Sequence, residues 1–343
     1  MIPRLPALTI DELTSRLGSA ARARAVVRWL YGTAPLPQAL PAAVPGVAAA
    51  AWRTLRAATP WNPPLVRERQ ASADGTTKYA LAFGATLVEA VRIPSPRRST
   101  VCVSSQSGCT RRCVFCATRT LGFGRHLRAD EMVLQVMLAA AEAPPEAPVR
   151  NVVFMGMGEP MDNLGEVLRA VRVLTQSPAP LLRARSITVS TSGVLPGMRR
   201  FLRESPASLA LSLHATTDDV RARLVPHGRI WPIAALMALL REDAARHPRR
   251  ECFVEYVLCA GVNDADADAD RLLRLLDGIG ARVNLIPYNA FPGSDLAPPP
   301  SARVLAFQAR LAAAGRRAFI RWPRGRAIAA ACGQLALATA TAE

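Results

Sequence analysis

Three cysteines stand close together in this chain and are its clearest candidates for metal chemistry. Cys109, Cys113 and Cys116 have the spacing C-x3-C-x2-C. Three thiolates on one loop can bind three irons of a cubane cluster and leave the fourth iron without a protein ligand. A structural zinc site would need a fourth protein ligand, and His126, ten residues further on, stands alone. The spacing therefore favours an iron–sulfur cluster with one open iron.

The other four cysteines are scattered. The total of seven is odd and no secretion signal precedes them, so a disulfide framework is not expected. Taken alone, Cys102 in a predicted strand and Cys332 near the C-terminus would each be an inert, buried residue. Cys252 and Cys259 belong to no motif, and we expect both to pack in the core.

Small and polar residues at predicted strand ends form a second group. Gly158 and Glu159 end one strand, where glycine allows close approach of the backbone and a carboxylate can pair with an ammonium group. The alternative is a glycine-rich turn with a solvated glutamate. The other candidates lie at or beyond the ends of strands, where α/β folds bind ligands: Ser190, Ser212, Leu213, His214 and Asn289. In isolation, His214 is more often a packed or capping residue and Asn289 a turn residue.

Alternating strands and helices must position these residues. Short apolar runs predict strands at 101–105, 149–155, 186–190, 208–213, 252–258 and 283–287. Helical periodicity falls between them, at 129–140, 164–174, 195–202, 233–245 and 267–276. Strands joined by helices predict a parallel sheet, open or curled into a partial barrel, with the active site at the C-terminal ends of its strands.

Segments of different character flank this core. The first sixty residues predict short helices at 10–17, 21–30 and 47–57, separated by a proline-rich stretch. A strand pair is expected at 78–83 and 86–93, and a last helix and strand at 302–314 and 319–322. We therefore divide the chain into four parts: a helical accessory module (1–64), a β extension (65–98), an α/β core (99–325) and a C-terminal segment (326–343).

Composition excludes several classes of protein. Half of the 343 residues are hydrophobic and a fifth are charged, which is globular rather than disordered composition. Prolines interrupt the longest uncharged stretch, so no membrane span is expected, and the first thirteen residues lack the apolar core of a signal peptide, which predicts a cytoplasmic protein. The net charge of +17 predicts an anionic partner, with nucleic acid first and an acidic membrane second. Lys78 is the single lysine beside 42 arginines, a bias typical of GC-rich codon usage.

The motifs taken together resemble a known family. The chain reads CVSSQSGC at 102–109, CVFC at 113–116 and GFGRHL at 122–127. Further pieces follow in order: NVVFMGMGEP at 151–160, VSTSG at 189–193, LSLHA at 211–215, NLIPYN at 284–289 and ACGQL at 331–335. This succession resembles the RlmN/Cfr family of radical S-adenosylmethionine (SAM) RNA adenine methyltransferases, and within it the RlmN branch, over nearly the whole chain.

The resemblance implies a fold and cofactors. The fold would be α/β, a partial (β/α)6 radical SAM barrel with a small N-terminal helical domain that binds RNA and a β extension. Cys109, Cys113 and Cys116 would hold one [4Fe-4S] cluster. Two SAM molecules would be used per turnover, and the residues expected to contact SAM are Gly158, Glu159, Ser190, Ser212, Leu213, His214 and Asn289.

The resemblance also implies a reaction. The C2–H of adenine is neither acidic nor nucleophilic, so polar methyl transfer from SAM would fail there. One SAM would instead methylate Cys332, and the radical from a second SAM would activate that methyl group for addition to the ring. Glu89 would accept the ring proton, and Cys102 would free the product by forming a transient disulfide with Cys332. Taken alone, Glu89 would be a solvated strand carboxylate.

Partners and rival functions follow from the same resemblance. The substrate would be 23S rRNA, with tRNA as a second candidate, and a flavodoxin or ferredoxin would donate the electron; we expect a monomer without a membrane partner. The candidate RNA contacts are arginines: Arg111, Arg112, Arg119, Arg125, Arg183, Arg185, Arg316, Arg317, Arg321, Arg324 and Arg326. The rivals are Cfr-like methylation at adenine C8, a radical SAM activase acting on a protein, and an iron–sulfur RNA-binding module without catalysis.

Overall fold

One large sheet organises the computed structural model, which describes residues 4–32, 34–176 and 182–337. Its strands are β1 (Leu65–Ala71), β2 (Thr77–Phe83), β3 (Thr86–Ser95), β4 (Arg98–Cys102), β7 (Val149–Phe154), β8 (Ile187–Thr191), β9 (Ser208–Ser212), β10 (Cys252–Leu258), β11 (Arg282–Pro287) and β12 (Ala318–Ile320). They are hydrogen-bonded in that order, and β1 and β12 are the two edges, so the sheet does not close on itself. From β4 to β12 every neighbouring pair is parallel. The predicted α/β fold with a parallel sheet is confirmed, and β12 extends the six predicted parallel strands by one.

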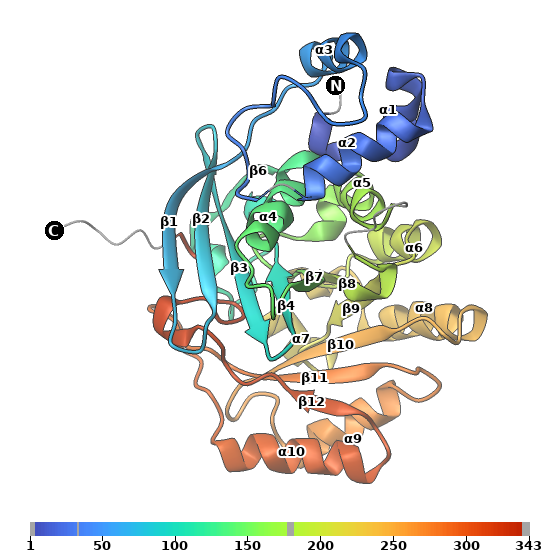
Figure 1. Ribbon diagram of the computed structural model, residues 1–343. Coiled ribbons are helices and arrows are strands. Elements are labelled where there is room, and N and C mark those ends of the chain that lie inside the picture. The colour runs from blue at the N-terminus through green and yellow to red at the C-terminus, as the bar shows by residue number, and fades with distance from the viewer. Residues whose placement is uncertain (1–3, 33, 177–181, 338–343) are drawn as a thin grey trace, which may run out of the picture.

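Helices between the parallel strands cover the outer face of this sheet (Figure 1). They are α4 (Ala129–Ala141), α5 (Leu164–Thr175), α6 (Leu195–Glu204), α8 (Ile233–Arg246), α9 (Asp266–Leu275) and α10 (Ser301–Ala313). The short helix α7 (Asp218–Leu224) packs instead against the loop of the clustered cysteines, where the Val114 N–H donates to Leu224 O at 3.0 Å. In α5 the buried residues Val167, Ala170, Val171 and Leu174 recur at helical spacing, which gives the helix one apolar face. Both faces of the parallel strands are therefore buried, as in β9, where four of five residues are buried.

The N-terminal module consists of three helices, α1 (Ile10–Leu17), α2 (Ala20–Gly32) and α3 (Ala49–Ala58). A capping box between Thr9 and Glu12 begins α1. The Arg169 side chain on α5 lies 3.0 Å from the Glu12 carboxylate, and the Ile10 N–H donates to the Gln176 side chain at 2.6 Å. These contacts fix the module against α5, where the blue helices of Figure 1 lie over α5.

The β extension is continuous with the main sheet. β1, β2, β3 and β4 pair antiparallel in succession, and β4 then begins the parallel part. The β2 and β3 strands match the predicted strand pair. β1 was not predicted, because its sequence LVRERQA is mostly polar and every second residue is exposed. This register brings residues of β2, β3 and β4 to one face of the sheet.

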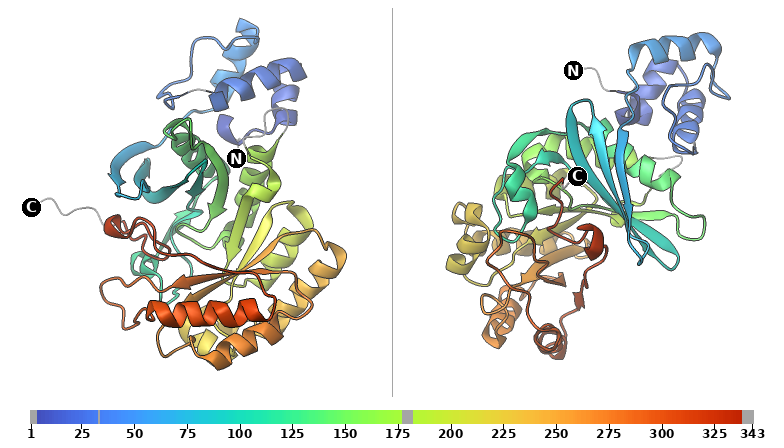
Figure 2. Two further views of the ribbon diagram at one scale, coloured as in Figure 1. Left: turned by 60° about the horizontal axis from the view of Figure 1, so that its bottom comes forward. Right: turned by 90° about the vertical axis from the view of Figure 1, so that its left-hand side faces the viewer.

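The C-terminal segment crosses the open side of the sheet. After β12 the chain forms a short 3-10 turn at Arg326–Ile328 and runs back toward the loop that follows β4, as the red segment in Figure 2 shows. The Ala117 N–H donates to Gly333 O at 2.6 Å, and Thr118 Oγ1 donates to Leu335 O at 2.6 Å. Residues 330–337 are thereby held against the cysteine loop. No helix in the described part of the chain is long and apolar enough to cross a membrane.

Candidate active site

The three clustered cysteines lie on a tightly bent loop between a small hairpin and a 3-10 helix. The hairpin pairs β5 (Gln106–Gly108) with β6 (Phe123–His126), and the 3-10 helix spans Ala117–Leu121. The Cys109 N–H donates to Gly122 O at 2.8 Å, which closes the loop at its base. Gly108 has a φ of 67°, and a Cβ there would overlap Gly122 O. Glycine at 108 is thus required for the loop to close.

The chemistry of the loop fits the predicted cluster. Burial raises the pKa of the Cys109 thiol to about 12, and burial also raises the pKa of Cys113 and Cys116. The thiols are near enough to one another that mutual repulsion raises the pKa of Cys109 and Cys113 further. No group of Cys, His, Asp or Glu side chains among the described residues is arranged to hold a single metal ion. Three thiols that repel one another as thiolates, with no fourth protein ligand, fit an iron–sulfur cluster, whose positive irons stabilise the deprotonated sulfurs.

The loop that ends β7 packs directly on this cysteine region through Gln106. Gly158 has a φ of 104°, and a Cβ there would lie 2.6 Å from Gln106 Cβ. The Gln106 side-chain oxygen accepts from the Glu159 N–H at 2.9 Å and the Thr110 N–H at 3.3 Å. Gln106 therefore couples the glycine-rich loop to the cysteine loop. The sequence contains Gln106 within the family motif, but its role was not predicted.

The Glu159 carboxylate is largely occupied by protein groups. One oxygen accepts from the Met161 N–H at 3.1 Å, and the other from the Ser192 N–H and hydroxyl, both at 2.7 Å. Burial raises the pKa of Glu159 despite these hydrogen bonds. A carboxylate has about four acceptor positions, so one remains for an ammonium group such as that of SAM. Its role as a SAM contact stays a prediction.

A cavity of about 130 Å³ lies inside the curl of the sheet, at the C-terminal ends of the parallel strands. It brings together several of the predicted residues with others that were not predicted. Its lining includes Cys116, Ser190, Ser212, His214, Glu255, Asn289, Arg321 and Cys332. Among the predicted site residues, Gly158, Glu159, Leu213, Cys109, Cys113, Cys102 and Glu89 do not line it. The cavity therefore joins one cluster cysteine to the proposed methyl carrier.

Cys332 is held in this cavity from two sides. The Asn289 side-chain amide donates to Cys332 O at 3.1 Å, and the adjacent Gly333 is bonded to the cysteine loop through Ala117. The Asn289 side-chain oxygen is buried and has no partner among the described residues, which leaves an acceptor for a ligand in the cavity. Cys332 is exposed as a whole residue, whereas its thiol is enclosed by protein at the cavity. Burial by the surrounding protein raises the pKa of its thiol, and the Arg321 guanidinium opposes that rise.

His214 is a neutral, packed residue with an unusual backbone. Its φ is 58°, its Nδ1 accepts from the Val257 N–H at 3.0 Å, and its ring meets Phe115 edge-on at 4.5 Å. Burial and the nearby Arg221 charge lower the pKa of His214 to about 3. The ring therefore carries its proton on Nε2 and supports the cysteine loop through Phe115. The predicted neighbour Ser190 donates to Phe154 O at 2.8 Å and also faces the cavity.

Cys102 and Glu89 lie on the same face of neighbouring strands, outside the cavity lining. Cys102 pairs with Val91 across β3 and β4, and Glu89 is two residues from Val91, so all three point to one face. Burial raises the pKa of Cys102 to about 12, the nearby Cys332 raises it further, and Arg321 lowers it. Cys332 and Cys102 thus lie within electrostatic reach of each other, as free thiols. Their roles in resolving the adduct and accepting the ring proton stay predictions.

Glu255 is a cavity residue that was not predicted from the sequence, and Arg321, predicted as an RNA contact, lines the cavity as well. Glu255 on β10 is buried, accepts from the Asn284 amide at 2.7 Å, and has its other oxygen 3.7 Å from Arg321 Nε. Burial raises the pKa of Glu255. A glutamate inside an otherwise apolar predicted strand was the available signal. Cys252 and Cys259, in contrast, pack against hydrophobic clusters, which confirms the prediction for them.

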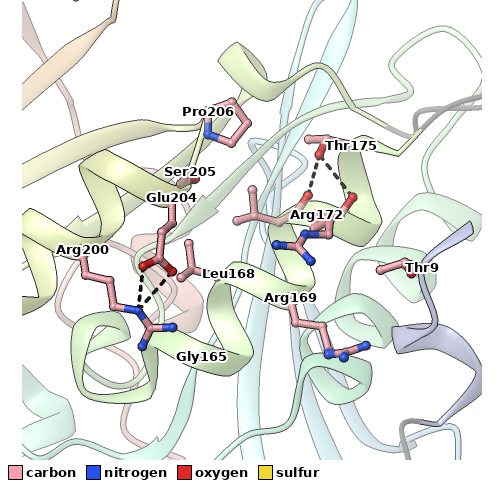
Figure 3. A pocket seen from close by; sticks show the side chains of 11 residues that line it. Thr9, Gly165, Leu168, Arg169, Arg172, Thr175, Arg200, Glu204, Ser205 and Pro206 are labelled. Carbon is pink, nitrogen blue, oxygen red and sulfur yellow. Dashed lines mark hydrogen bonds and ion pairs between the residues drawn. The ribbon is translucent and has the colours of Figure 1, made fainter. Parts of the chain in front are cut away.

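A second hollow, of about 420 Å³, lies on the outside of the molecule between α5, α6 and the start of α1 (Figure 3). Two of its three arginines are engaged in ion pairs: Arg169 with Glu12, and Arg200 with Glu204 at 3.1 Å. It contains no cysteine or other predicted site residue. We therefore place the active site at the smaller inner cavity.

The candidate RNA contacts divide into free and engaged arginines. Arg111 is buried and ion-paired with Asp162, so it holds the cysteine loop rather than RNA, contrary to its selection as a surface contact. Arg316 is half-buried and donates to the carbonyls of Ile279 and Leu276. The exposed candidates for which no ion pair is seen among the described residues are Arg112, Arg183, Arg185, Arg317 and Arg326. Two aromatic side chains are exposed as well: Phe123, after the cysteine loop, and Trp322, which lies between Arg317 and Arg326 in the sequence.

Comparisons with known proteins agree with this geometry. Residues 103–273 match the family model of the radical SAM superfamily. The dual-specificity RNA methyltransferase RlmN of Syntrophobacter fumaroxidans is 46% identical over 79% of this chain and 79% of its own length. The RlmN of an Anaeromyxobacter strain is 43% identical over 97% of this chain and 89% of its own. A crystal structure of a radical SAM methyltransferase from Sphaerobacter thermophilus superposes with a TM-score of 0.87 at 39% identity, over 97% of this chain and 99% of the other.

Proposed function

This chain belongs to the RlmN family of radical SAM RNA methyltransferases, and from that premise we propose that it methylates carbon 2 of an adenine in 23S rRNA and in tRNA. It is a SAM-dependent RNA methyltransferase, and its family uses a [4Fe-4S] cluster together with SAM. RNA as the substrate class sets aside the alternatives of an activase acting on a protein and of a module without catalysis. We propose further that the methylated position is C2 of adenine rather than C8, and that the substrates are these two RNAs.

The observation that best supports a covalent route is the setting of Cys332. Cys332 lines the same cavity as Cys116, and its own carbonyl is held by Asn289. Backbone contacts of the adjacent residues hold this segment against the cysteine loop, and they place the Cys332 side chain in the cavity that Cys116 also lines. We infer that Cys332 carries the methyl group.

In the proposed route each protein group has one task. When bound, the cluster and SAM would supply a 5′-deoxyadenosyl radical that takes hydrogen from the methyl group on Cys332, and the cluster would accept the one electron released after the resulting carbon radical has bonded to the adenine ring. As a thiolate, Cys332 first attacks the methyl carbon of one SAM, displaces S-adenosylhomocysteine and holds the methyl group as a thioether; Arg321 lowers the pKa of the Cys332 thiol and so favours the thiolate. Glu89 accepts the C2 proton of the Cys332-linked adenine.

Release of the product needs the second cysteine. Cys102 attacks the sulfur of Cys332, a sulfur–sulfur bond forms, and the sulfur–carbon bond breaks. The electron pair of that bond stays on the carbon, which takes a proton and becomes the methyl group of the product. The disulfide must then be reduced before another turnover. Two SAM molecules are consumed in each cycle.

The RNA and electron-transfer partners follow from surface properties. The chain carries a net charge of +17; exposed Arg112 lies within the cysteine loop, exposed Arg326 lies in the C-terminal segment, and Phe123 and Trp322 are exposed aromatic residues. Phosphate contacts and stacking of this kind offset the few kcal/mol needed to unstack a base. We propose a monomer in the cytoplasm, reduced by a flavodoxin or ferredoxin, with the N-terminal module of residues 1–64 as an RNA-binding domain.

The test is to map methylated adenines in rRNA and tRNA from a strain that lacks this protein and from the complemented strain. Loss of 2-methyladenosine at defined sites, restored by the wild-type chain but not by Cys332→Ala, is the expected result. Loss of 8-methyladenosine instead would assign the Cfr-like reaction. RNA of unchanged composition in the deletion strain would refute the proposed substrates.

A further inference from the structure

Lys78 is an anomaly of composition and of burial. It is the single lysine beside 42 arginines, so the bias that supplied arginine at every other basic position did not do so here. It lies on β2 with only 5% of its surface exposed. A buried ammonium group is costly unless it is paired and hydrogen-bonded. The role of Lys78 can therefore be inferred from the group with which it forms an ion pair.

That partner is Glu89, the predicted proton acceptor. Lys78 Nζ lies 3.1 Å from Glu89 Oε1, and the side chains are 5% and 2% exposed. In the β2–β3 register Ala80 faces Glu89 and Lys78 faces Val91, so Lys78 and Glu89 are diagonal neighbours on one face. Val91 in turn faces Cys102 on β4. The ion pair and the predicted resolving cysteine thus share one face of three adjacent strands.

The second carboxylate oxygen of Glu89 has a different kind of partner. Oε2 accepts from the Leu337 N–H, in the C-terminal segment that carries Cys332, at 3.1 Å. Because the Glu89 side chain is only 2% exposed, an adenine can reach it only when the C-terminal segment moves away. Glu89 Oε2 then loses its hydrogen bond from Leu337, whereas Glu89 Oε1 keeps its ion pair with Lys78. The lysine is built into the sheet and cannot leave with the segment.

We propose that Lys78 is a positioning residue for Glu89, whose carboxylate it holds by a charge-assisted hydrogen bond in the orientation that removes the ring proton. This inference rests on the proposed function, in which Glu89 is the base. In the step concerned, the C2 proton of the Cys332-linked adenine moves to Glu89. The electron pair of the C–H bond stays with the adduct, and Lys78 keeps its own proton throughout.

A lysine suits this place better than an arginine for a physical reason. The ammonium group is compact and has three donors, whereas a guanidinium has five donors in a fixed plane. In a nearly closed site each unsatisfied donor carries a desolvation cost. Lysine therefore supplies the charge at Glu89 with the fewest groups to satisfy.

The experiment follows single turnovers of the reconstituted enzyme with RNA and compares three steps: formation of 5′-deoxyadenosine, methylation of Cys332, and breakdown of the covalent protein–RNA adduct on denaturing gels. The variants are Lys78→Met, Lys78→Arg, Glu89→Gln and the double variant Lys78→Met/Glu89→Gln. Arg69→Met is the matched control, since it removes an exposed ion pair with Glu142 from the neighbouring strand β1.

We expect Lys78→Met to form 5′-deoxyadenosine and methylated Cys332 normally but to break down the adduct about 100-fold more slowly, the lower range of what a positioned base contributes. Lys78→Arg keeps the charge and is expected to retain most of the rate, and Lys78→Met should add nothing in the Glu89→Gln background. Breakdown at the wild-type rate in Lys78→Met would overturn the inference, as would equal losses in all three steps or an arginine variant as slow as the methionine one. A wild-type enzyme that forms no adduct would instead refute the proposed function.

Discussion

Replacement of Gly158 by alanine tests how the glycine-rich loop and the cysteine loop depend on each other. The new Cβ would lie 2.6 Å from Gln106 Cβ and 2.8 Å from the Gln106 backbone nitrogen, and the residue would keep a φ of 104° that side chains rarely adopt. A strained backbone position costs about 1–3 kcal/mol, and overpacking costs about 1–3 kcal/mol more. We therefore expect a loss of about 2–6 kcal/mol, a large fraction of the stability of an ordinary domain.

The effect should reach the cluster because Gln106 must move. Its side-chain oxygen accepts from both the Glu159 and Thr110 N–H groups, so a shift of Gln106 weakens the loop on both sides. Denaturant unfolding should show the lower stability, and reconstitution should yield less iron and weaker SAM binding by equilibrium dialysis.

Gly165→Ala provides the control. Gly165 lies in the first turn of α5, and no neighbouring atom lies within 4 Å of where its Cβ would be. Alanine there should leave stability unchanged or raise it by up to about 1 kcal/mol. If Gly158→Ala unfolds, takes up iron and binds SAM as Gly165→Ala does, the reasoning about this loop is wrong.

Three further predictions address the cysteines and the C-terminal segment. Cys332→Ala should abolish methyl transfer to RNA, with SAM cleavage also lost or uncoupled, whereas Cys259→Ala should leave methyl transfer intact. Transfer of a labelled methyl group from SAM to RNA measures the activity of both variants. Normal turnover by Cys332→Ala would exclude a covalent carrier. Burial raises the pKa of Cys102 to about 12 from about 9, so the fraction of its thiol that is ionised at pH 8 falls about a thousandfold. Iodoacetamide should therefore label Cys102 at least 100-fold more slowly in the native than in the urea-unfolded protein. Equal labelling rates would contradict the burial of Cys102. Asn289→Ala removes the bond to Cys332 O, worth about 0.5–1.5 kcal/mol, so hydrogen exchange in residues 331–337 should quicken several-fold, and unchanged exchange would show that Asn289 does not anchor this segment.

The order of elements was predictable because its signals are local. Apolar runs and helical periodicity along the chain lie where β7 to β11 and α4 to α6 form. β1 and α7 escaped prediction since the first is mostly polar and the second is a seven-residue helix with two aspartates and two arginines. The 3-10 turn at 326–328 is likewise too short to leave a periodic signal.

The site was harder to predict because its contacts are distant in sequence. The motifs named Cys332, Asn289 and Glu89, yet the Asn289 bond to Cys332 spans 43 residues and the Glu89 bond to Leu337 spans 248. No local pattern reports such pairings. Glu159 differs from its prediction in another way. The sequence predicted a carboxylate free to bind a ligand, whereas hydrogen bonds from Ser192 and Met161 occupy most of its acceptor positions. Burial of Arg111 against Asp162 was equally invisible in a chain rich in exposed arginine.

The single lysine has a practical consequence for labelling chemistry. Reagents that acylate lysine side chains find one target in the whole sequence, and that target is closed within the sheet beside Glu89. Under native conditions, acylation of Lys78 therefore requires a local opening of the β extension or of the C-terminal segment that covers it. The rate of acylation of Lys78, measured by mass spectrometry, therefore reports how often this side of the partial barrel opens. A change in that rate on adding RNA would show whether the substrate favours the open or the closed state of the region.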